Sequence, residues 1–164
     1  MGSNSLELYL LRHGIAEDRA PSGRDADRAL TDPGKHKLEK VLKRAHKAGV
    51  HPTLIVSSPY KRAMETAEIA ARELEYNSEI VRSDRLTPNS SPPDLWSKIR
   101  AHRDEPSILL AGHEPLFSAT IAYLLGSTRA MVEFRKGALV RIDFSTIGAE
   151  PRGVLQWMLT PKLS

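Results

Sequence analysis

The chain contains no cysteine among its 164 residues. Without thiols there can be no disulfide bond, no zinc site built on thiolates and no cysteine nucleophile. The first residues also lack a basic stretch followed by a long apolar one, so no secretory signal is visible. We therefore expect a cytoplasmic protein that works in a reducing compartment.

Long hydrophobic runs are absent as well, and no segment reaches the length of a membrane span. Hydrophobic residues make up 40% of the chain and charged residues 27%, which is typical of a globular protein that does not associate with membranes. A length of 164 residues suits one domain. We predict a single domain over residues 6–164 and set Met1 to Ser5 aside as a tag remnant.

The charge balance is slightly basic, with 24 Lys and Arg residues against 20 Asp and Glu residues. A basic surface attracts phosphates, acidic proteins or nucleic acid. The densest cluster, Lys35 to Lys47, alternates with apolar residues at helical spacing, which indicates an amphipathic helix with a solvated face. No zinc finger and no mixture of aromatic and basic residues accompanies it, so we expect no nucleic-acid partner.

Short apolar runs alternate with helical patterns along most of the chain. We expect Asp32 to cap the first helix and Gly49 to end it, and Ser58 to start the second helix in the same way. Strands that alternate with helices predict an α/β fold of the phosphoglycerate mutase-like kind, with a mostly parallel central sheet and helices on both faces. The predicted strands cover residues 7–11, 53–56, 79–82, 107–111, 138–144 and 154–160.

Reactive side chains follow three of these strands. Arg12 and His13 follow the first strand, Ser58 and then Arg62 follow the second, and His113 follows the strand at 107–111. Ligands of open α/β sheets bind outside the carboxyl ends of the strands, so residues about a hundred positions apart should converge there. Helix N-termini near two of these strand ends favour an anion.

Two arginines and two histidines describe a site for phosphoryl transfer. The planar guanidinium binds phosphate oxygens in pairs. A neutral imidazole is a competent nucleophile near pH 7, and a second imidazole, if protonated, adds positive charge. Each residue alone also has a structural interpretation, as a helix cap or a surface cation. Their convergence favours a covalent phosphohistidine intermediate, with no metal and no cofactor required.

Four motifs carry a resemblance to a known family: "LYLLRHG" around Arg12, His13 and Gly14, then "LTDPG", "SSPYKRAMETAE" and "LLAGHEP". In this order they resemble the histidine phosphatase superfamily, which has the phosphoglycerate mutase-like fold. The resemblance implies that His13 is the phosphorylated nucleophile and that Arg12, Arg62 and His113 form the phosphate pocket. We add Ser58 to this pocket, and also Gly14, which should allow a tight turn and give the phosphate room.

The stretch "RLTPNSSPPD" departs from many members of that family. They carry a glutamate two residues after a leucine there, and this glutamate protonates the leaving alcohol. Here Leu86 is followed by Thr87 and Pro88, which resembles the SixA-type phosphohistidine phosphatases. An imidazole leaving group, with a pKa of about 6.5, needs less help from an acid than an alkoxide does. Asp84, Glu114 or Glu17 could still supply a proton.

The short loop between Leu86 and Asp94 predicts an open site that accepts a phosphorylated side chain on a protein, such as a histidine-phosphotransfer domain. The leading hypothesis is therefore a metal-independent phosphatase that hydrolyses phosphohistidine on a protein. One alternative is a phosphomonoesterase of the same fold that acts on small-molecule or aryl phosphates. Another is a module that binds phosphate or a phosphoprotein without turnover. The substrate, the pathway and the oligomeric state stay open.

Overall fold

A six-stranded sheet with the order β3-β2-β4-β1-β5-β6 organises the computed structural model, which describes residues 5–163. Except for Ser5, the segment set aside as a tag remnant lies outside the described residues. Strands β1 to β4 run parallel, whereas β5 is antiparallel to both of its neighbours. The strands are β1 (Leu6–Arg12), β2 (Leu54–Ser57), β3 (Val81–Arg82), β4 (Ser107–Gly112), β5 (Leu139–Phe144) and β6 (Val154–Leu159).

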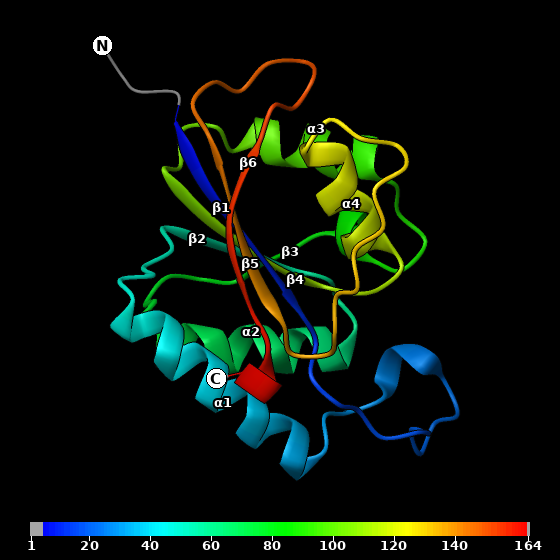
Figure 1. Ribbon diagram of the computed structural model, residues 1–164. Helices are drawn as coiled ribbons and strands as arrows, with labels where there is room; N and C mark the ends of the chain where they lie inside the picture. The colour runs from blue at the N-terminus through cyan, green and yellow to red at the C-terminus, as the bar shows by residue number, and fades with distance from the viewer. Residues whose placement is uncertain (1–4, 164) are drawn as a thin grey trace.

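Four α-helices in the described part of the chain cover the two faces of this sheet (Figure 1). Helices α1 and α2 pack against each other on one face, and α3 and α4 lie together on the other. The expected α/β class, with a mostly parallel sheet between two helical layers, is confirmed. The helices are α1 (Asp32–Lys47), α2 (Lys61–Glu73), α3 (Pro92–Ala101) and α4 (Leu116–Leu124), with short 3-10 helices η1 (Asp25–Asp27), η2 (Asp84–Leu86) and η3 (Pro161–Leu163).

The two helical layers enclose two hydrophobic cores of different character. The core between the sheet and α3 and α4 is rich in aromatic rings, with Trp96 against Phe144 and Phe117 against Phe134. The core under α1 and α2 is mostly aliphatic. Strands β2 and β4 are buried along their whole length because helices cover both of their faces. The parallel strand ends are thereby held in fixed positions.

The starts of α1 and α2 differ from the sequence-based expectation. Thr31, rather than Asp32, caps α1, and its hydroxyl oxygen accepts a hydrogen bond from Gly34 N at 3.1 Å. Gly49 follows the end of α1 with a φ of +86°, as expected of a helix-terminating glycine. Helix α2 begins only at Lys61 and has no side-chain cap, because the Ser58 hydroxyl bonds elsewhere.

Candidate active site

The strand ends bring the two predicted histidines together. Strands β1 and β4 are hydrogen-bonded neighbours, and Arg12 lies opposite Gly112 in their register. His13 and His113 are the next residues of the two strands, so their rings must be close. Their ring centroids are 5.1 Å apart, and both side chains are buried. The predicted convergence at the carboxyl ends of the parallel strands is therefore observed.

The hydrogen bonds of His13 define which ring nitrogen is free. Its Nδ1 lies 2.7 Å from the carbonyl oxygen of Gly14, which can only accept, so Nδ1 carries the hydrogen. The lone pair is then on Nε2, where Arg62 Nε–H donates to it at 3.4 Å. Burial lowers the pKa of His13 to about 4, against the opposing effect of the Gly14 hydrogen bond and with further lowering by neighbouring cations. The imidazole is therefore neutral at neutral pH.

His113 has a hydrogen-bond network of its own. Its Nε2 lies 2.8 Å from the hydroxyl oxygen of Ser58, which also accepts from Tyr60 N at 3.2 Å. The Ser58 hydroxyl can donate to Nε2 or accept from it. We assign it the donating role, which places the ring hydrogen of His113 on Nδ1. This Nδ1 is buried and has no hydrogen-bond partner among residues 5–163. It is a donor that a bound anion could satisfy.

The protein favours the neutral form of His113, the second imidazole of the predicted site. Burial, the neighbouring His13 and the cation of Arg62 together lower the pKa of His113 to about 3. An imidazolium enclosed in this way would lose its hydration and face a second positive charge. His113 therefore enters the site as a neutral hydrogen-bond donor. A phosphoryl dianion beside it would favour the protonated form, as any opposite charge does.

Arg62 is buried in the first turn of α2, where its guanidinium meets an unexpected partner. Its Nη1 donates to the backbone oxygen of Asp25 at 2.8 Å, and its Nη2 lies 3.1 Å from Asp25 Oδ2. The ring of Tyr60 lies 5.2 Å from the guanidinium carbon. A carboxylate therefore binds the face of Arg62 that carries its Nη groups, while Arg62 Nε points at His13.

Sequence reasoning missed Asp25 entirely. It belongs to η1, in the long segment between β1 and α1 that loops away from the sheet in Figure 1. No periodicity or motif places this loop, and the only local signal is the spacing of Asp25 and Arg28, which form an ion pair at 2.9 Å. Hydrogen bonds from Arg28 and Arg62 hold the pKa of Asp25 below its ordinary value. Asp25 is therefore ionised at neutral pH.

Arg12 is the last residue of β1 and precedes His13 in the chain. Its Nη1 donates to the carbonyl oxygen of Phe134 at 2.8 Å, which fixes the orientation of the guanidinium. Its Nε is buried and has no hydrogen-bond partner within residues 5–163. Burial lowers the pKa of Arg12, and the carboxylate of Glu114 partly offsets this effect. Arg12 and His113 thus each contribute an unpartnered buried donor close to His13.

Gly14 has a packing role that the sequence did not reveal. Its φ lies outside the left-handed region, so backbone conformation alone does not require a glycine there. A Cβ at this position would lie 2.8 Å from Leu38 Cδ1 and 3.2 Å from Gly34 O, both in α1. The backbone N–H of Gly14 donates to Thr66 Oγ1 at 3.2 Å. Gly14 therefore lets β1 approach α1 and α2 closely, which positions His13.

The three carboxylates considered as proton donors are dispersed. Glu114 lies nearest, because its charge acts on Arg12, and its Oε1 accepts from Ser118 N at 2.6 Å. Asp84 is exposed in η2 and lines a hollow with residues of α3 instead. Glu17 is exposed in the loop after β1. Asp25, which was not considered, contacts Arg62 directly, with 3.1 Å between Asp25 Oδ2 and Arg62 Nη2.

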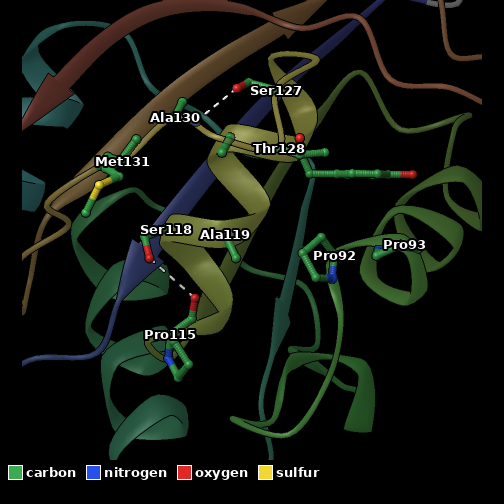
Figure 2. Close-up of a pocket in the computed structure, with 12 residues that line it drawn as sticks. Pro92, Pro93, Pro115, Ser118, Ala119, Ser127, Thr128, Ala130 and Met131 are labelled. Atoms are coloured by element: carbon green, nitrogen blue, oxygen red, sulfur yellow. Dashed lines mark hydrogen bonds between the residues drawn. The ribbon is translucent and has the colours of Figure 1, made fainter.

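A hollow of about 450 Å³ opens beside the site, between α4, the start of α3 and the segment after α4 (Figure 2). Pro115, two residues after His113, lies at its lower end, and Met131 is almost fully exposed at its rim. Ser127 accepts hydrogen bonds from the backbone N–H groups of Arg129 and Ala130, which orders this segment. The hollow therefore lies two residues along the chain from His113, which is itself buried.

Neither a metal cluster nor a membrane helix accompanies the site in the described part of the chain. Residues 5–163 contain no group of three or more His, Asp or Glu side chains that could hold a metal ion. No helix within the same residues is long and apolar enough to cross a membrane. The positive charge around His13 comes from arginine side chains and from Lys136.

Comparisons with known proteins agree with this geometry. Residues 8–87 match the sequence model of the histidine phosphatase superfamily, branch 1. An uncharacterised protein of Picosynechococcus sp. is 32% identical over 163 residues, covering 96% of this chain and 98% of the relative. The matched region includes most of β1, all of β2 and β3, and the residues Arg12, His13 and Arg62.

Two solved structures match almost the whole chain. The protein histidine phosphatase SixA in complex with tungstate superposes with a TM-score of 0.85 at 24% identity, covering 96% of this chain and 98% of that one. A protein assigned as phosphohistidine phosphatase SixA from Agrobacterium tumefaciens superposes with a TM-score of 0.81 at 28% identity, covering 95% and 98%. With its motifs, its fold and its paired histidines, this chain belongs to branch 1 of the histidine phosphatase superfamily and is a phosphatase.

Proposed function

We propose that this phosphatase hydrolyses phosphohistidine on a protein, through a covalent phosphohistidine intermediate at His13 and without a metal ion. One observation carries the proposal. The neutral ring of His13 is locked by its Nδ1–H bond to Gly14 O, and its Nε2 lone pair lies 3.4 Å from Arg62 Nε. In-line phosphoryl transfer requires a nucleophile with a free lone pair and a cation beside it that binds the phosphate. His13, held in one tautomer, and Arg62 fill these two roles.

The reaction proceeds in two displacements. His13 Nε2 attacks the phosphorus atom, the bond from phosphorus to the substrate imidazole breaks, and the departing imidazole takes up a proton. Water then attacks the phosphorus of phospho-His13, the bond to Nε2 breaks, and inorganic phosphate leaves with His13 regenerated. The guanidinium groups of Arg12 and Arg62 and the Nδ1–H of His113 stabilise the charge on the equatorial oxygens.

Pro88 supports phosphohistidine as the substrate. The position that carries a carboxylic acid in many members of the family is a proline here, two residues after the end of η2. An alkoxide leaving group has a conjugate acid with a pKa near 15.7, and a general acid accelerates its departure by roughly 10²- to 10⁴-fold. Imidazole, with a pKa of about 6.5, leaves with a proton from water at neutral pH. The likeness to structures named SixA points the same way.

The open surroundings of the site support a protein-bound substrate. The segment between η2 and α3 is short, and a hollow opens at Pro115, two residues after His113. A phosphorylated histidine on the surface of another protein, such as a histidine-phosphotransfer domain, can therefore reach His13. The absence of cysteine fits a substrate protein that also resides in a reducing cytoplasm.

Comparing leaving groups tests the proposal directly. kcat/KM would be measured at neutral pH for a phosphohistidine protein, an aryl phosphate and an alkyl phosphate such as phosphoserine. We expect the values to fall in that order, because each successive bond needs more proton donation in the transition state. Binding alone cannot produce this order, since all three present a similar phosphoryl group to Arg12 and Arg62. Activity should also survive chelators, and loss in EDTA with recovery in zinc or magnesium would contradict the metal-independent mechanism.

A phosphomonoesterase is the second candidate, favoured by the carboxylate of Glu114, whose charge acts on Arg12. If the alkyl ester matches phosphohistidine, an acid acts on the leaving group, and Glu114→Gln should then lower the alkyl rate selectively. Asp84→Asn and Glu17→Gln serve as controls, because both side chains lie in exposed segments. If phosphate binds but no phospho-compound is turned over, the protein is a binding module instead.

A further inference from the structure

Five cationic side chains surround a single cavity next to the active site. The cavity measures about 710 Å³, and its lining contains no acidic residue. The cations come from four separate parts of the fold: the end of β1, helix α1, the loop before β5 and the 3-10 helix η3. They are Arg12, Lys37, Arg135, Lys136 and Lys162, and Ile15 and Pro161 complete the lining.

Few of these charges are neutralised within the protein. Arg135 lies 3.2 Å from Glu133, in an ion pair whose two side chains are both exposed. Lys37, Lys136 and Lys162 form no ion pair with any residue in the range 5–163. Cations repel one another, so their clustering around one cavity raises the free energy of the folded protein unless an anion is bound there.

The cavity adjoins the phosphate pocket. Arg12 lines the cavity and belongs to the pocket around His13. Lys136 is close enough that its charge contributes to the lowered pKa of His13. An anionic group in the cavity would thus lie near a phosphoryl group on His13, because both would adjoin Arg12.

We infer that the cavity lined by Lys37, Arg135, Lys136 and Lys162 is a docking surface for a carboxylate-rich patch beside the phosphohistidine of a protein substrate. This inference rests on the proposed function and specifies the surface chemistry of its substrate. Clustered charge of one sign raises the association rate of an oppositely charged partner and orients it before contact.

An acidic protein surface fits this cavity better than a second phosphate on a small molecule. The side chains of Lys37, Arg135, Lys136 and Lys162 are all exposed. Exposed, flexible cations attract anions over a wide area. A buried guanidinium, in contrast, binds the oxygens of one phosphate in a fixed geometry. Each such contact is weak alone, so recognition requires several carboxylates at once.

Two synthetic phosphohistidine peptides of equal length test this inference. One carries Asp and Glu around the phosphohistidine, and the other carries Asn and Gln at the same positions. For the wild-type protein we expect kcat/KM to be about tenfold higher for the acidic peptide at low ionic strength, mostly through KM. The preference should decline as NaCl is added, because exposed charges are screened.

A triple variant, Lys37→Gln/Arg135→Gln/Lys162→Gln, removes cations from the cavity but spares Arg12 and Lys136, whose charges act on the phosphate pocket. It should lose most of the acidic-peptide preference and of its salt dependence, while the neutral peptide is hydrolysed within about twofold of the wild-type rate. The matched control is Lys40→Gln/Lys43→Gln/Arg44→Gln, which removes the same charge from exposed positions of α1 outside the cavity.

The outcomes separate this inference from the proposed function. Equal hydrolysis of both peptides by the wild-type protein, or an equal loss of preference in both triple variants, would overturn the docking surface and leave the phosphatase assignment intact. A preference for a small substrate with two phosphates over the acidic peptide would overturn it in favour of a second phosphate subsite. If the wild-type protein hydrolyses neither peptide but cleaves phosphate esters, the phosphohistidine proposal itself fails, and with it this inference.

Discussion

The floor and the rim of the active site are built in different ways. The floor consists of the residues at the ends of β1, β2 and β4, and His13, Ser58 and His113 are all buried there. The rim consists of exposed side chains from loops, of which Asp25 and Lys136 act on the floor through their charges. Backbone hydrogen bonds between neighbouring strands fix the floor. The rim is positioned by side-chain contacts, such as that of Arg62 with Asp25. We expect the floor to supply the chemistry and the rim to select what reaches it.

The largest effect should come from the floor, through His13→Ala. Without the imidazole there is no covalent intermediate, so kcat/KM should fall by at least about 10³-fold. The measurement is steady-state hydrolysis of a phosphohistidine protein. Circular dichroism and calorimetric binding of inorganic phosphate serve as controls, because Arg12 and Arg62 remain. Retention of more than a few per cent of the wild-type activity would show that another residue is the nucleophile.

Arg62 should show the next largest effect. Its Nε contacts His13, so Arg62→Ala should cost about 2 to 4 kcal/mol of transition-state stabilisation, roughly 30- to 1000-fold in kcat/KM. Arg62→Lys should recover only part of this loss, because an ammonium cannot bind two phosphoryl oxygens as a fork. Arg28→Ala is a useful comparison, since Arg28 pairs with Asp25 but makes no recorded contact with His13. If Arg62→Ala and Arg28→Ala lowered kcat/KM by the same factor, Arg62 would act as a rim residue rather than as part of the floor.

The buried histidines should also make stability depend on pH. The pKa values of His13 and His113 are lowered to about 4 and about 3, below the value of about 6.5 expected for an unfolded chain. At a pH between the folded and unfolded pKa values, the unfolded state binds more protons than the folded state. The free energy of unfolding therefore falls as the pH falls below about 6.5. From pH 7 to pH 5 the loss should be roughly 2 kcal/mol for each histidine.

Urea unfolding of the wild-type protein at the two pH values measures this loss. The same experiment on His13→Ala and His113→Ala isolates each contribution, and each variant should show a smaller dependence on pH than the wild-type protein. A wild-type stability that is constant between pH 7 and pH 5 would mean that the two imidazoles are hydrated.

The smallest effect should come from the rim, through Asp25→Asn. The carboxylate holds Arg62 and repels a phosphate dianion, so its neutralisation should tighten inhibition by inorganic phosphate. Because the Asp25 side chain is half exposed, the gain should be only about 1 kcal/mol, or about fivefold in the inhibition constant. The matched control is Asp27→Asn, the neighbouring carboxylate of η1, which pairs with Arg24 instead. An equal gain in both variants would assign the effect to general charge rather than to Asp25.

The floor was largely predictable from sequence, and the rim was not. Continuous apolar runs indicate buried parallel strands, and residues that follow such strands meet at one edge of the sheet. This was enough to bring Arg12, His13, Arg62 and His113 together. Asp25 belongs to a loop of 19 residues between β1 and α1, whose path depends on contacts with Arg62 and Glu65 of α2, which are far away in the sequence.

By itself, the sequence determined which chemical groups stand at the strand ends, because hydrophobic periodicity and strand order are local properties of the chain. Only the tertiary structure decided their protonation and their partners. The neutrality of His113 follows from its burial against His13, and the packing role of Gly14 follows from the approach of Leu38 in α1. Both depend on distances between segments far apart in the chain, and these distances exist only once the two helical layers have closed on the sheet.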